Sequence, residues 1–280
     1  MSKFFEQIVR SGTGAVLPPA EIPQFQALIE RKIVVAKEAA SVATPSLATP
    51  VKPATDLQEP RVNGYRKIQI DEFAFLRNRF RNADSLEAAE EAYRALRTRL
   101  LGLKSSQGLR SLQLTSATPG EGKTMTAFNL AVCCARLQDM SVLLVDADIR
   151  GKGLTRTLAL RPSPGLAEIL SGQAEPEKAI LAAGIPNLYV LPSGESNIAL
   201  AEQFAHERWQ KFMGWCHEAF KLVIVDSPPV LHFADNHLIS ASCDGVLMVV
   251  RAHQAKRGLL EKSAREVDPR KLLGLVYNAV

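Results

Sequence analysis

Cysteine is scarce in this 280-residue sequence, and its four cysteines follow no pattern typical of crosslinks or of metal binding. Small disulfide-stabilised proteins have many regularly spaced cysteines, and structural zinc sites have Cys-x-x-Cys pairs. The five histidines also lack metal-ligand spacing with each other or with the cysteines. We therefore expect a reducing, cytosolic compartment and no metal site built from cysteine and histidine.

Long apolar runs are absent as well. No uninterrupted run approaches the length of about 18 residues that a membrane-spanning helix requires. The first residues, MSKFFEQIVR, do not contain the apolar core of a secretory signal. We expect a soluble, cytoplasmic protein that reaches the inner face of a membrane only through a partner.

The formal net charge is +5, and the basic excess lies entirely before Ser111. Residues 1–110 contain 17 Lys and Arg against 12 Asp and Glu, whereas residues 111–280 contain 17 of each. A basic front segment can contact an anionic membrane surface, an acidic partner or nucleic acid, or it can be a solvated face. The charge alone does not select among these.

The composition supports one folded domain with an extension. With 46% hydrophobic residues the chain can form the core of a single α/β domain. Residues 39–60 are rich in Ala, Pro, Thr and Ser and have no periodicity, which is typical of a flexible linker. The sequence therefore predicts a largely disordered extension over residues 1–60 and a folded domain over residues 61–280.

A strong helical pattern begins the folded domain and is followed by several strand patterns. From Ser85, the sequence SLEAAEEAYRALRTRLLGLK has apolar residues at three- and four-residue intervals, with Ser85 as the N-cap. Apolar runs then alternate with helical patterns: SLQLTS, SVLLVDAD, LYVLPSG, LVIVDSPP, GVLMVV and LGLVYNAV. Because continuous apolar runs indicate strands buried on both faces, we expect an α/β fold with a doubly wound, mostly parallel sheet.

A candidate phosphate-binding loop separates the first strand pattern from the next helix. Residues 117–124 read ATPGEGKT and match the pattern G-x-x-x-x-G-K-[ST], except that Ala117 replaces the first glycine. Backbone N–H groups in this loop can face phosphate oxygens, Lys123 can reach the β- and γ-phosphates, and the Thr124 hydroxyl can bind Mg²⁺. An ordinary glycine-rich turn is the alternative, and seven matching positions argue against it. The candidate nucleotide-binding residues are Thr118, Pro119, Gly120, Glu121, Gly122, Lys123, Thr124 and Met125.

Acidic residues follow two of the predicted strands. Asp146 and Asp148 end the run VLLVDAD, and Asp226 ends the run LVIVD. Open parallel sheets bind ligands outside the carboxyl ends of their strands, and a carboxylate in the position of Asp226 commonly supports the Mg²⁺ shell. The order of phosphate loop, D-x-D and D-x-P-P is far more specific than any one of these motifs.

Residues 85–280 resemble the bacterial tyrosine kinases (BY-kinases), a family of P-loop kinases of exopolysaccharide and capsule production. The matching pieces include EEAYRALRTRL, TSATPGEGKT, LLVDADIR, PGLAEILSG and LVIVDSPPV, with Asp235 downstream. The resemblance implies that Mg²⁺ and ATP are the cofactors. It also implies that Lys123, Asp146 and Asp148 are catalytic, with Asp146 the base for a tyrosine hydroxyl, and that Thr124, Asp148 and Asp226 surround the metal. Arg150 can add charge near the phosphates or pair with the aspartates.

The resemblance also implies an assembly and a partner. The family's E-x-x-R-x-x-R helix motif, used for ring assembly, is matched by Glu91, Arg94 and Arg97. This spacing puts the three side chains on one helical face, where they can pair with a neighbouring subunit or within the helix. The implied partner is a membrane chain-length determinant, also called a polysaccharide co-polymerase, and no nucleic acid is expected.

The tyrosines differ from the family pattern, which usually has a tyrosine-rich tail. The sequence has four tyrosines, and of these Tyr65 is expected to be accessible. Tyr93 lies on the assembly helix, whereas Tyr189 and Tyr277 lie in apolar strand patterns and are expected to be partly buried. The segment SNIALAEQF also replaces a proline-containing run of the family. The kinase therefore phosphorylates another chain, or the protein only hydrolyses or senses ATP.

Three other functions compete with the kinase. Partitioning and Min-type ATPases have a second lysine after the first glycine of the loop, and here that position is Thr118. A nucleic-acid-binding module would interleave aromatic and basic residues, as FAFLRNRFRN partly does, although packing on the domain explains that segment better. A scaffold in which ATP only stabilises the ring is the third. The sequence favours a Mg·ATP-dependent, protein-tyrosine-kinase-like ATPase of exopolysaccharide or capsule export.

Overall fold

The computed structural model describes residues 65–70, 83–195, 204, 207–233, 235–251 and 257–278. The predicted extension over residues 1–60, its boundary with the domain and the segment FAFLRNRFRN lie outside the described residues. SNIALAEQF also lies outside them, except for its last residue, Phe204. These expectations remain predictions.

One eight-stranded sheet organises the domain, with the strand order β1-β4-β5-β3-β6-β2-β7-β8. All strand pairs are parallel except β4 with β5, which confirms the predicted mostly parallel sheet. The strands are β1 (Arg66–Lys67), β2 (Ser111–Ser116), β3 (Val142–Asp146), β4 (Leu181–Ala182), β5 (Leu188–Leu191), β6 (Leu222–Asp226), β7 (Gly245–Arg251) and β8 (Leu272–Asn278).

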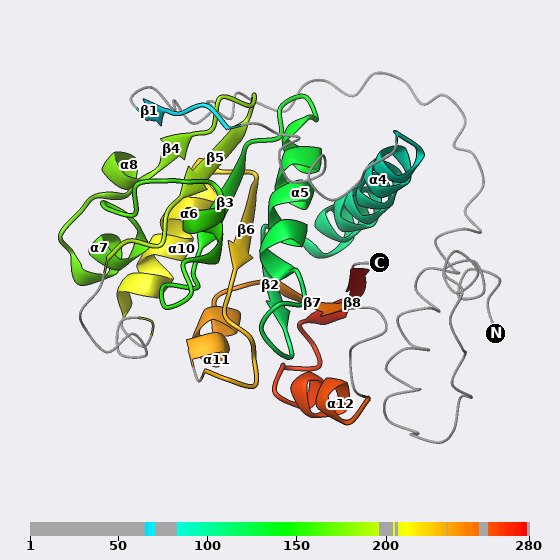
Figure 1. The fold of residues 1–280 in the computed structure, drawn as a ribbon. Helices are drawn as coiled ribbons and strands as arrows, with labels where there is room; N and C mark the ends of the chain where they lie inside the picture. Colours follow the sequence, from blue (N-terminus) through cyan, green and yellow to red (C-terminus); the bar gives the residue numbers. More distant parts are fainter. Residues whose placement is uncertain are drawn as a thin grey trace.

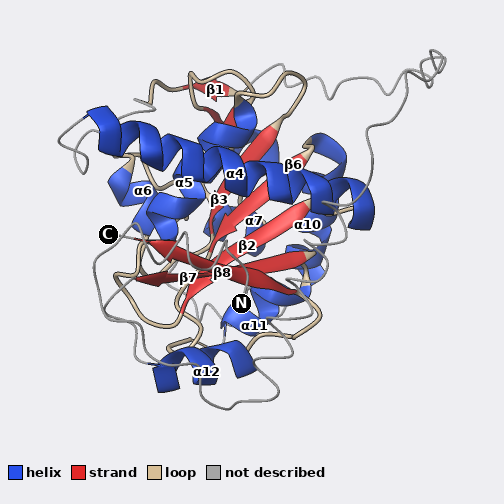
Figure 2. Cartoon of the chain, turned by 90° about the vertical axis from the view of Figure 1, so that its right-hand side faces the viewer, coloured by secondary structure: helices blue, strands red, loops and turns tan. Residues whose placement is uncertain are grey.

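Helices cover both faces of this sheet, as the doubly wound fold predicts. Figure 1 shows α4 and α5 on one face and α7 and α10 on the opposite face, while α11 lies near the end of the sheet where β2 joins α5. In Figure 2, α4 crosses in front of the sheet strands. The helices are α4 (Ala83–Gln107), α5 (Lys123–Ala135), α6 (Gly153–Thr157), α7 (Leu166–Ser171), α8 (Pro176–Ala179), α10 (Glu207–Ala219), α11 (Asp235–Ala241) and α12 (Arg257–Arg265).

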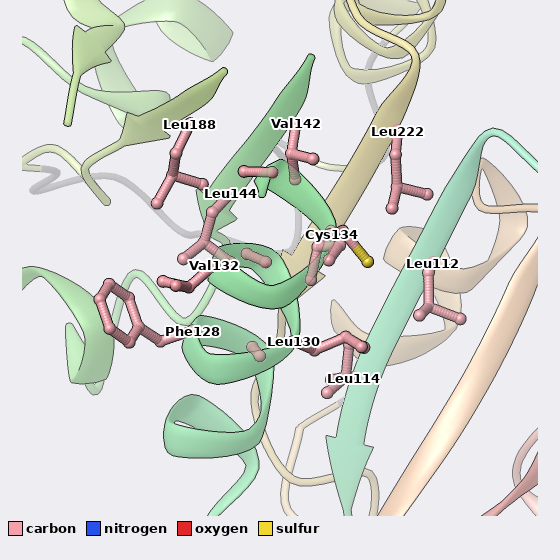
Figure 3. Packing of buried hydrophobic residues seen from close by; sticks show 14 of the residues in the cluster. Leu112, Leu114, Phe128, Leu130, Val132, Cys134, Val142, Leu144, Leu188 and Leu222 are labelled. Carbon is pink, nitrogen blue, oxygen red and sulfur yellow. The ribbon is translucent and has the colours of Figure 1, made fainter. Parts of the chain in front are cut away.

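Alternate residues of β3 belong to two separate apolar cores, one on each face of the sheet. In β3, Val142 and Leu144 pack with α5, whereas Leu143 and Val145 pack with α7 and α10. Figure 3 shows the α5 side of this arrangement, with Leu144 close to the helix. Because successive strand residues point to opposite faces, an uninterrupted apolar run is needed to bury both. This is the physical reason that the apolar runs predicted these strands correctly.

The sequence was less accurate for short strands and for one helix boundary. The two-residue strands β1 and β4 carry no readable period and were not predicted. Helix α4 begins at Ala83, two residues before Ser85, so Ser85 lies inside the helix and is not its N-cap. Helix ends are the least certain part of a periodicity reading, because the apolar pattern fixes the buried face and not the first turn.

Candidate functional site

The phosphate loop lies between β2 and α5, as predicted. Gly120 and Gly122 have φ angles of +83° and +91°, in the left-handed region that glycine adopts readily. A Cβ atom on Gly122 would collide with Nδ2 of Asn278, the last residue of β8. That Nδ2 donates a hydrogen bond of 2.9 Å to the Glu121 carbonyl. The final strand therefore supports the loop from outside.

The loop tolerates alanine at the first glycine position. Ala117 is buried, and it is not among the described non-glycine residues with positive φ, so its backbone does not require glycine. The Ala117 N–H donates to Oε2 of Glu121 at 3.3 Å, and the Thr118 hydroxyl donates to Oε1 at 2.8 Å. The Glu121 carboxylate thus fixes the first half of the loop, which leaves the second half for a phosphate.

Lys123 joins the loop to the predicted acidic residues. Its Nζ lies 2.9 Å from Oδ2 of Asp148 and 3.8 Å from Oδ1 of Asp226. Burial alone would lower the pKa of Lys123, but the carboxylates of Asp226 and Asp148 outweigh burial and raise the pKa. The lysine is therefore protonated and enclosed by acids at the phosphate-loop end of the sheet.

Asp226 and Asp146 are fully buried at paired positions of β6 and β3. No donor among the described residues meets either carboxylate oxygen of Asp226 with full hydrogen-bond geometry. Burial raises the pKa of Asp226 to about 6, and the charge of Lys123 and then the nearby Thr124 hydroxyl oppose that rise. Apart from the 3.8 Å ion pair with Lys123, the carboxylate is poorly compensated, which is costly in a folded protein unless a ligand uses it.

Asp146 is held more firmly than Asp226. Its Oδ2 accepts hydrogen bonds from the Thr155 amide at 2.8 Å and from the Thr155 hydroxyl at 2.6 Å, whereas its Oδ1 has no partner among the described residues. The Ser193 amide donates to the same hydroxyl at 2.9 Å. Burial and then the charge of Asp226 raise the pKa of Asp146 to about 7.

Two of the three predicted magnesium ligands lie around Gly153. A Cβ atom on Gly153 would lie 2.9 Å from Oγ1 of Thr124 and 3.9 Å from Oδ2 of Asp226. The third, Asp148, accepts from Lys123 and from the Gly151 amide. Oxygen donors of this kind suit Mg²⁺, which usually keeps several waters and binds through one or two carboxylates and substrate phosphates. Among the described residues, no three Asp, Glu, His or Cys side chains form a complete metal cage. The residues present therefore fit a magnesium ion that is also held by a nucleotide.

The predicted assembly residues are not part of this site. Arg94 pairs within α4 with Glu90 and Glu91, each at 3.0 Å, and its side chain is 45% exposed. Arg97 turns toward α5 and donates to the Cys133 carbonyl at 2.9 Å. In the isolated chain, the intrahelical alternative is therefore the one seen for Arg94, while Arg97 fastens two helices together.

The expectation for Tyr277 is wrong, and that for Tyr65 holds only in part. Tyr65 is half-buried: its ring packs against Tyr189 at 5.6 Å between ring centroids, and burial followed by the charge of Glu177 raises its pKa to about 12. Tyr277 was expected to be partly buried, but it is 54% exposed. It lies on β8, the last strand in the sheet order, which has no further neighbouring strand among the described residues. Tyr93 is half-buried, and its hydroxyl accepts a hydrogen bond from Asn129.

Sequence patterns missed several residues that shape the site. Thr155 and Asn278 hold Asp146 and the phosphate loop, but neither belongs to a motif. Gln113 is buried in β2, where it lies between two buried leucines, and this was the one available signal. The sequence left two roles open for Arg150, which were to add charge near the phosphates or to pair with the aspartates. In the structure its guanidinium pairs with Asp235 at 3.4 Å.

Comparison with known proteins agrees with this geometry. A family model described as an AAA domain matches residues 112–267. Among solved structures, an ATP complex of a McdA variant from Cyanothece has a TM-score of 0.50 at 25% identity, covering 60% of this chain and 70% of that one. The fold and the loop define the class as a P-loop nucleotide-binding protein.

More similar proteins narrow the class. Tyrosine-protein kinase YwqD of Bacillus subtilis is 34% identical over 191 residues, covering 67% of this chain and 80% of the relative. Tyrosine-protein kinase CpsD of Streptococcus agalactiae is 31% identical over 194 residues, covering 68% and 83%. The kinase domain of Escherichia coli tyrosine kinase ETK has a TM-score of 0.68 at 28% identity, covering 81% and 84%. The chain belongs to the bacterial tyrosine kinase family.

Proposed function

We propose that this chain is a Mg·ATP-dependent protein-tyrosine kinase that regulates the chain length and export of an exopolysaccharide or capsule. The main support for this proposal is the position of Lys123, which lies between Asp148 and Asp226. It stands beside a phosphate loop whose two glycines have positive φ angles. Family membership adds the acceptor class, since the relatives are named tyrosine-protein kinases. Phosphoryl transfer depends mainly on positioning and charge neutralisation, and these residues provide both.

Each residue has a task in this proposal. The amides of Gly120 to Thr124 and the Lys123 ammonium bind the phosphates, and Thr124, Asp148 and Asp226 hold the magnesium shell. Bound Mg²⁺ supplies positive charge that neutralises the phosphate oxygens. Asp146 accepts the proton of the incoming tyrosine hydroxyl, and a carboxyl pKa raised to about 7 suits a general base near neutral pH.

We further propose that copies of the chain assemble through the α4 face that carries Glu91, Arg94 and Arg97. A membrane-bound polysaccharide co-polymerase recruits the assembly to the inner face of the membrane and assists the nucleotide site. Among the described residues, no helix has both the length and the apolar character to cross a bilayer. The support for this partner is the family alone, and nucleic acid is not part of the proposal.

A second candidate is an ATP-driven switch or scaffold without kinase activity. Two observations favour this candidate. Asp146 is fully buried, and one of its carboxylate oxygens already accepts a hydrogen bond from Thr155. Thr118 argues against a partitioning or Min-type switch, because those ATPases have their second loop lysine at this position. The two candidates differ in whether tyrosine receives the phosphoryl group.

The deciding experiment incubates the full chain with labelled ATP and Mg²⁺, with and without the cytosolic tail of the partner. Lys123→Met removes the phosphate lysine, and Lys262→Met removes an exposed lysine of α12 as the matched control. We expect labelled phosphotyrosine from the wild type and from Lys262→Met, on the chain or on its partner, and none from Lys123→Met. Free phosphate without labelled protein would select the switch.

A further inference from the structure

The two loops that carry the magnesium carboxylates both contact the first turn of α11. One loop follows β3 and contains Asp148 and Arg150, and the other begins directly after Asp226, the last residue of β6, and contains Pro228. Consecutive residues at the start of α11, Asp235 and Asn236, reach these two loops separately. Figure 1 shows α11 beneath the ends of β2 and β6, on the side where the phosphate loop lies.

Asn236 fastens the loop after β6. Its side chain is buried, and its Nδ2 donates to the Pro228 carbonyl at 2.7 Å and to Oγ1 of Thr115 at 2.8 Å. The Thr115 hydroxyl donates to the same carbonyl at 2.9 Å. The carbonyl two residues after Asp226 is therefore fixed by two donors, one from α11 and one from the strand that leads into the phosphate loop.

Gln113 extends this network along β2. Its Nε2 donates to Oγ of Ser227 at 2.9 Å and to Oδ1 of Asn236 at 3.1 Å, and all three residues are buried. The Ser227 hydroxyl in turn donates to the Leu114 carbonyl at 2.9 Å. Apart from Oε1 of Gln113, which has no partner among the described residues, the side chains of this network are hydrogen-bonded. Such bonds make a buried network rigid, since each broken bond leaves a desolvated group.

Asp235 fastens the loop after β3. Its carboxylate is buried and accepts from Nε and Nη2 of Arg150, each at 3.4 Å. The Arg150 guanidinium also lies over the ring of Phe233, 5.2 Å from its centroid. Arg150 is two residues after Asp148, so a contact at α11 fixes the loop on which that carboxylate stands.

We propose that Asp235 and Asn236 form a brace that sets the spacing between Asp148 and Asp226. Neither residue touches the reacting atoms, so both are positioning residues. The inference rests on the proposed phosphoryl-transfer function of the site. The physical reason is that a shift of about 1 Å in a reacting group can cost about 100-fold in rate, whereas the phosphate loop binds nucleotide through its own backbone. The brace therefore governs turnover and the use of Mg²⁺ and leaves metal-free nucleotide binding intact.

A purely structural network would affect only stability, and the chain offers a control for that. Asp244 also links elements through a carboxylate, since it accepts from the Arg110 amide and from the amide and hydroxyl of Ser111. These contacts lie at the amino end of β2, opposite the phosphate loop. Asp244→Asn should lower stability without changing turnover by folded molecules.

The test compares Asn236→Ala, Asp235→Asn and Asp244→Asn in the full chain. The measurements are kcat for ATP turnover, ADP affinity with and without Mg²⁺, and Tm. We expect both brace variants to lose about tenfold or more in kcat and most of the tightening of ADP binding by Mg²⁺. Their ADP affinity in a chelator should stay within about threefold of wild type. A fall in Tm with unchanged kcat and unchanged Mg²⁺ response would overturn the brace.

Arg150→Gln and the double variant with Asp235→Asn keep the test decisive if Asn236→Ala does not fold, because the Arg150 side chain is 46% exposed. We expect the double variant to lose no more kcat and no more Mg²⁺ response than either single variant. Additive losses would show Arg150 acting on the phosphates by itself, and the Asp235 part would be wrong. A wild type that binds no ADP would refute the proposed function, whereas an active wild type with fully active brace variants would refute only the brace.

Discussion

Some residues of the site have features that suit the proposed function rather than the stability of the fold. Asp226 has a buried carboxylate that no donor among the described residues meets with full hydrogen-bond geometry, and Gly122 has a backbone conformation that few residues adopt. The buried carboxylate costs stability, whereas glycine adopts a positive φ readily, so at position 122 only a residue with a side chain would be strained. Each feature leads to one prediction at the scale of the residue.

Asp226→Asn should stabilise the nucleotide-free protein and abolish its chemistry. Burial raises the pKa of Asp226 to about 6, so the folded state binds this proton more tightly than the unfolded state. The contribution of Asp226 to stability is therefore present below pH of about 4 and is lost as pH rises through about 6. At pH 8 we expect the variant to melt higher than wild type by roughly 2–5 °C, and the gap should close toward pH of about 4.5.

Turnover and the Tm increase caused by Mg·ATP should both disappear in Asp226→Asn. Calorimetry across this pH range, with and without nucleotide, provides the measurement. A lower Tm than wild type at pH 8 would contradict the assignment of Asp226 as a strained carboxylate.

Gly122→Ala should weaken both the fold and nucleotide binding. The residue has a φ of +91°, and the new Cβ would collide with Nδ2 of Asn278. We expect a loss of about 1–3 kcal/mol in the free energy of unfolding and at least about tenfold in ADP affinity. Urea unfolding and titration with a fluorescent ADP provide these values. Gly102→Ala is the control, because that glycine is helical with no atom near its Cβ position, and it should gain up to about 1 kcal/mol.

The double variant Gly122→Ala with Asn278→Ala separates the two causes of the loss. It removes the collision but keeps the strained φ, so it should recover only part of the stability. Full recovery would mean that the backbone conformation costs nothing.

At the scale of the element, the sequence predicted the main strands but not the side-chain contacts that join one element to another. The run LVIVD gave β6 with its boundaries, because every residue of that strand is buried on one face or the other. The helix pattern gave α4 but placed its start two residues late. Contacts between elements distant in sequence, such as Asp244 with Arg110, have no local period, and a single sequence does not contain them.

Asp244→Asn should destabilise the junction between α4, β2 and β7. Burial acts to raise the pKa of Asp244, but hydrogen bonds from Arg110 and Ser111 outweigh it and lower the pKa. We expect a loss of about 1–3 kcal/mol at pH 7. A carboxyl with a lowered folded pKa stabilises above its unfolded pKa, so the difference from wild type should shrink as pH falls below about 4. Urea unfolding at several pH values measures it, and a difference independent of pH would contradict the charged hydrogen bonds.

At the scale of the whole molecule, the α4 face proposed for assembly also contributes to folding. Arg94 and Glu91 are exposed and pair with neighbours on the same helix, whereas Arg97 fastens α4 to α5. An exposed intrahelical pair contributes little to stability and can exchange for a pair with another subunit. The two arginines of one motif therefore have different tasks in the isolated chain.

Arg94→Ala should abolish assembly while leaving unfolding and nucleotide binding unchanged. Arg97→Ala should cost about 1–2 kcal/mol, because its hydrogen bond to the Cys133 carbonyl joins two helices. Sedimentation velocity with Mg·ATP measures assembly, and thermal unfolding measures stability. If Arg94→Ala assembles normally, the proposed α4 interface is wrong.

The sequence by itself determined the parallel sheet, the phosphate loop and the acids that end β3 and β6, because buried strands and phosphate loops have local patterns. The tertiary structure decided that Ala117 is compatible with the loop, that Tyr277 rather than Tyr65 is exposed, and that Arg150 pairs with Asp235. These outcomes depend on contacts between residues far apart in the chain. Only the packing of the elements brings such residues together, so no local period could have predicted them.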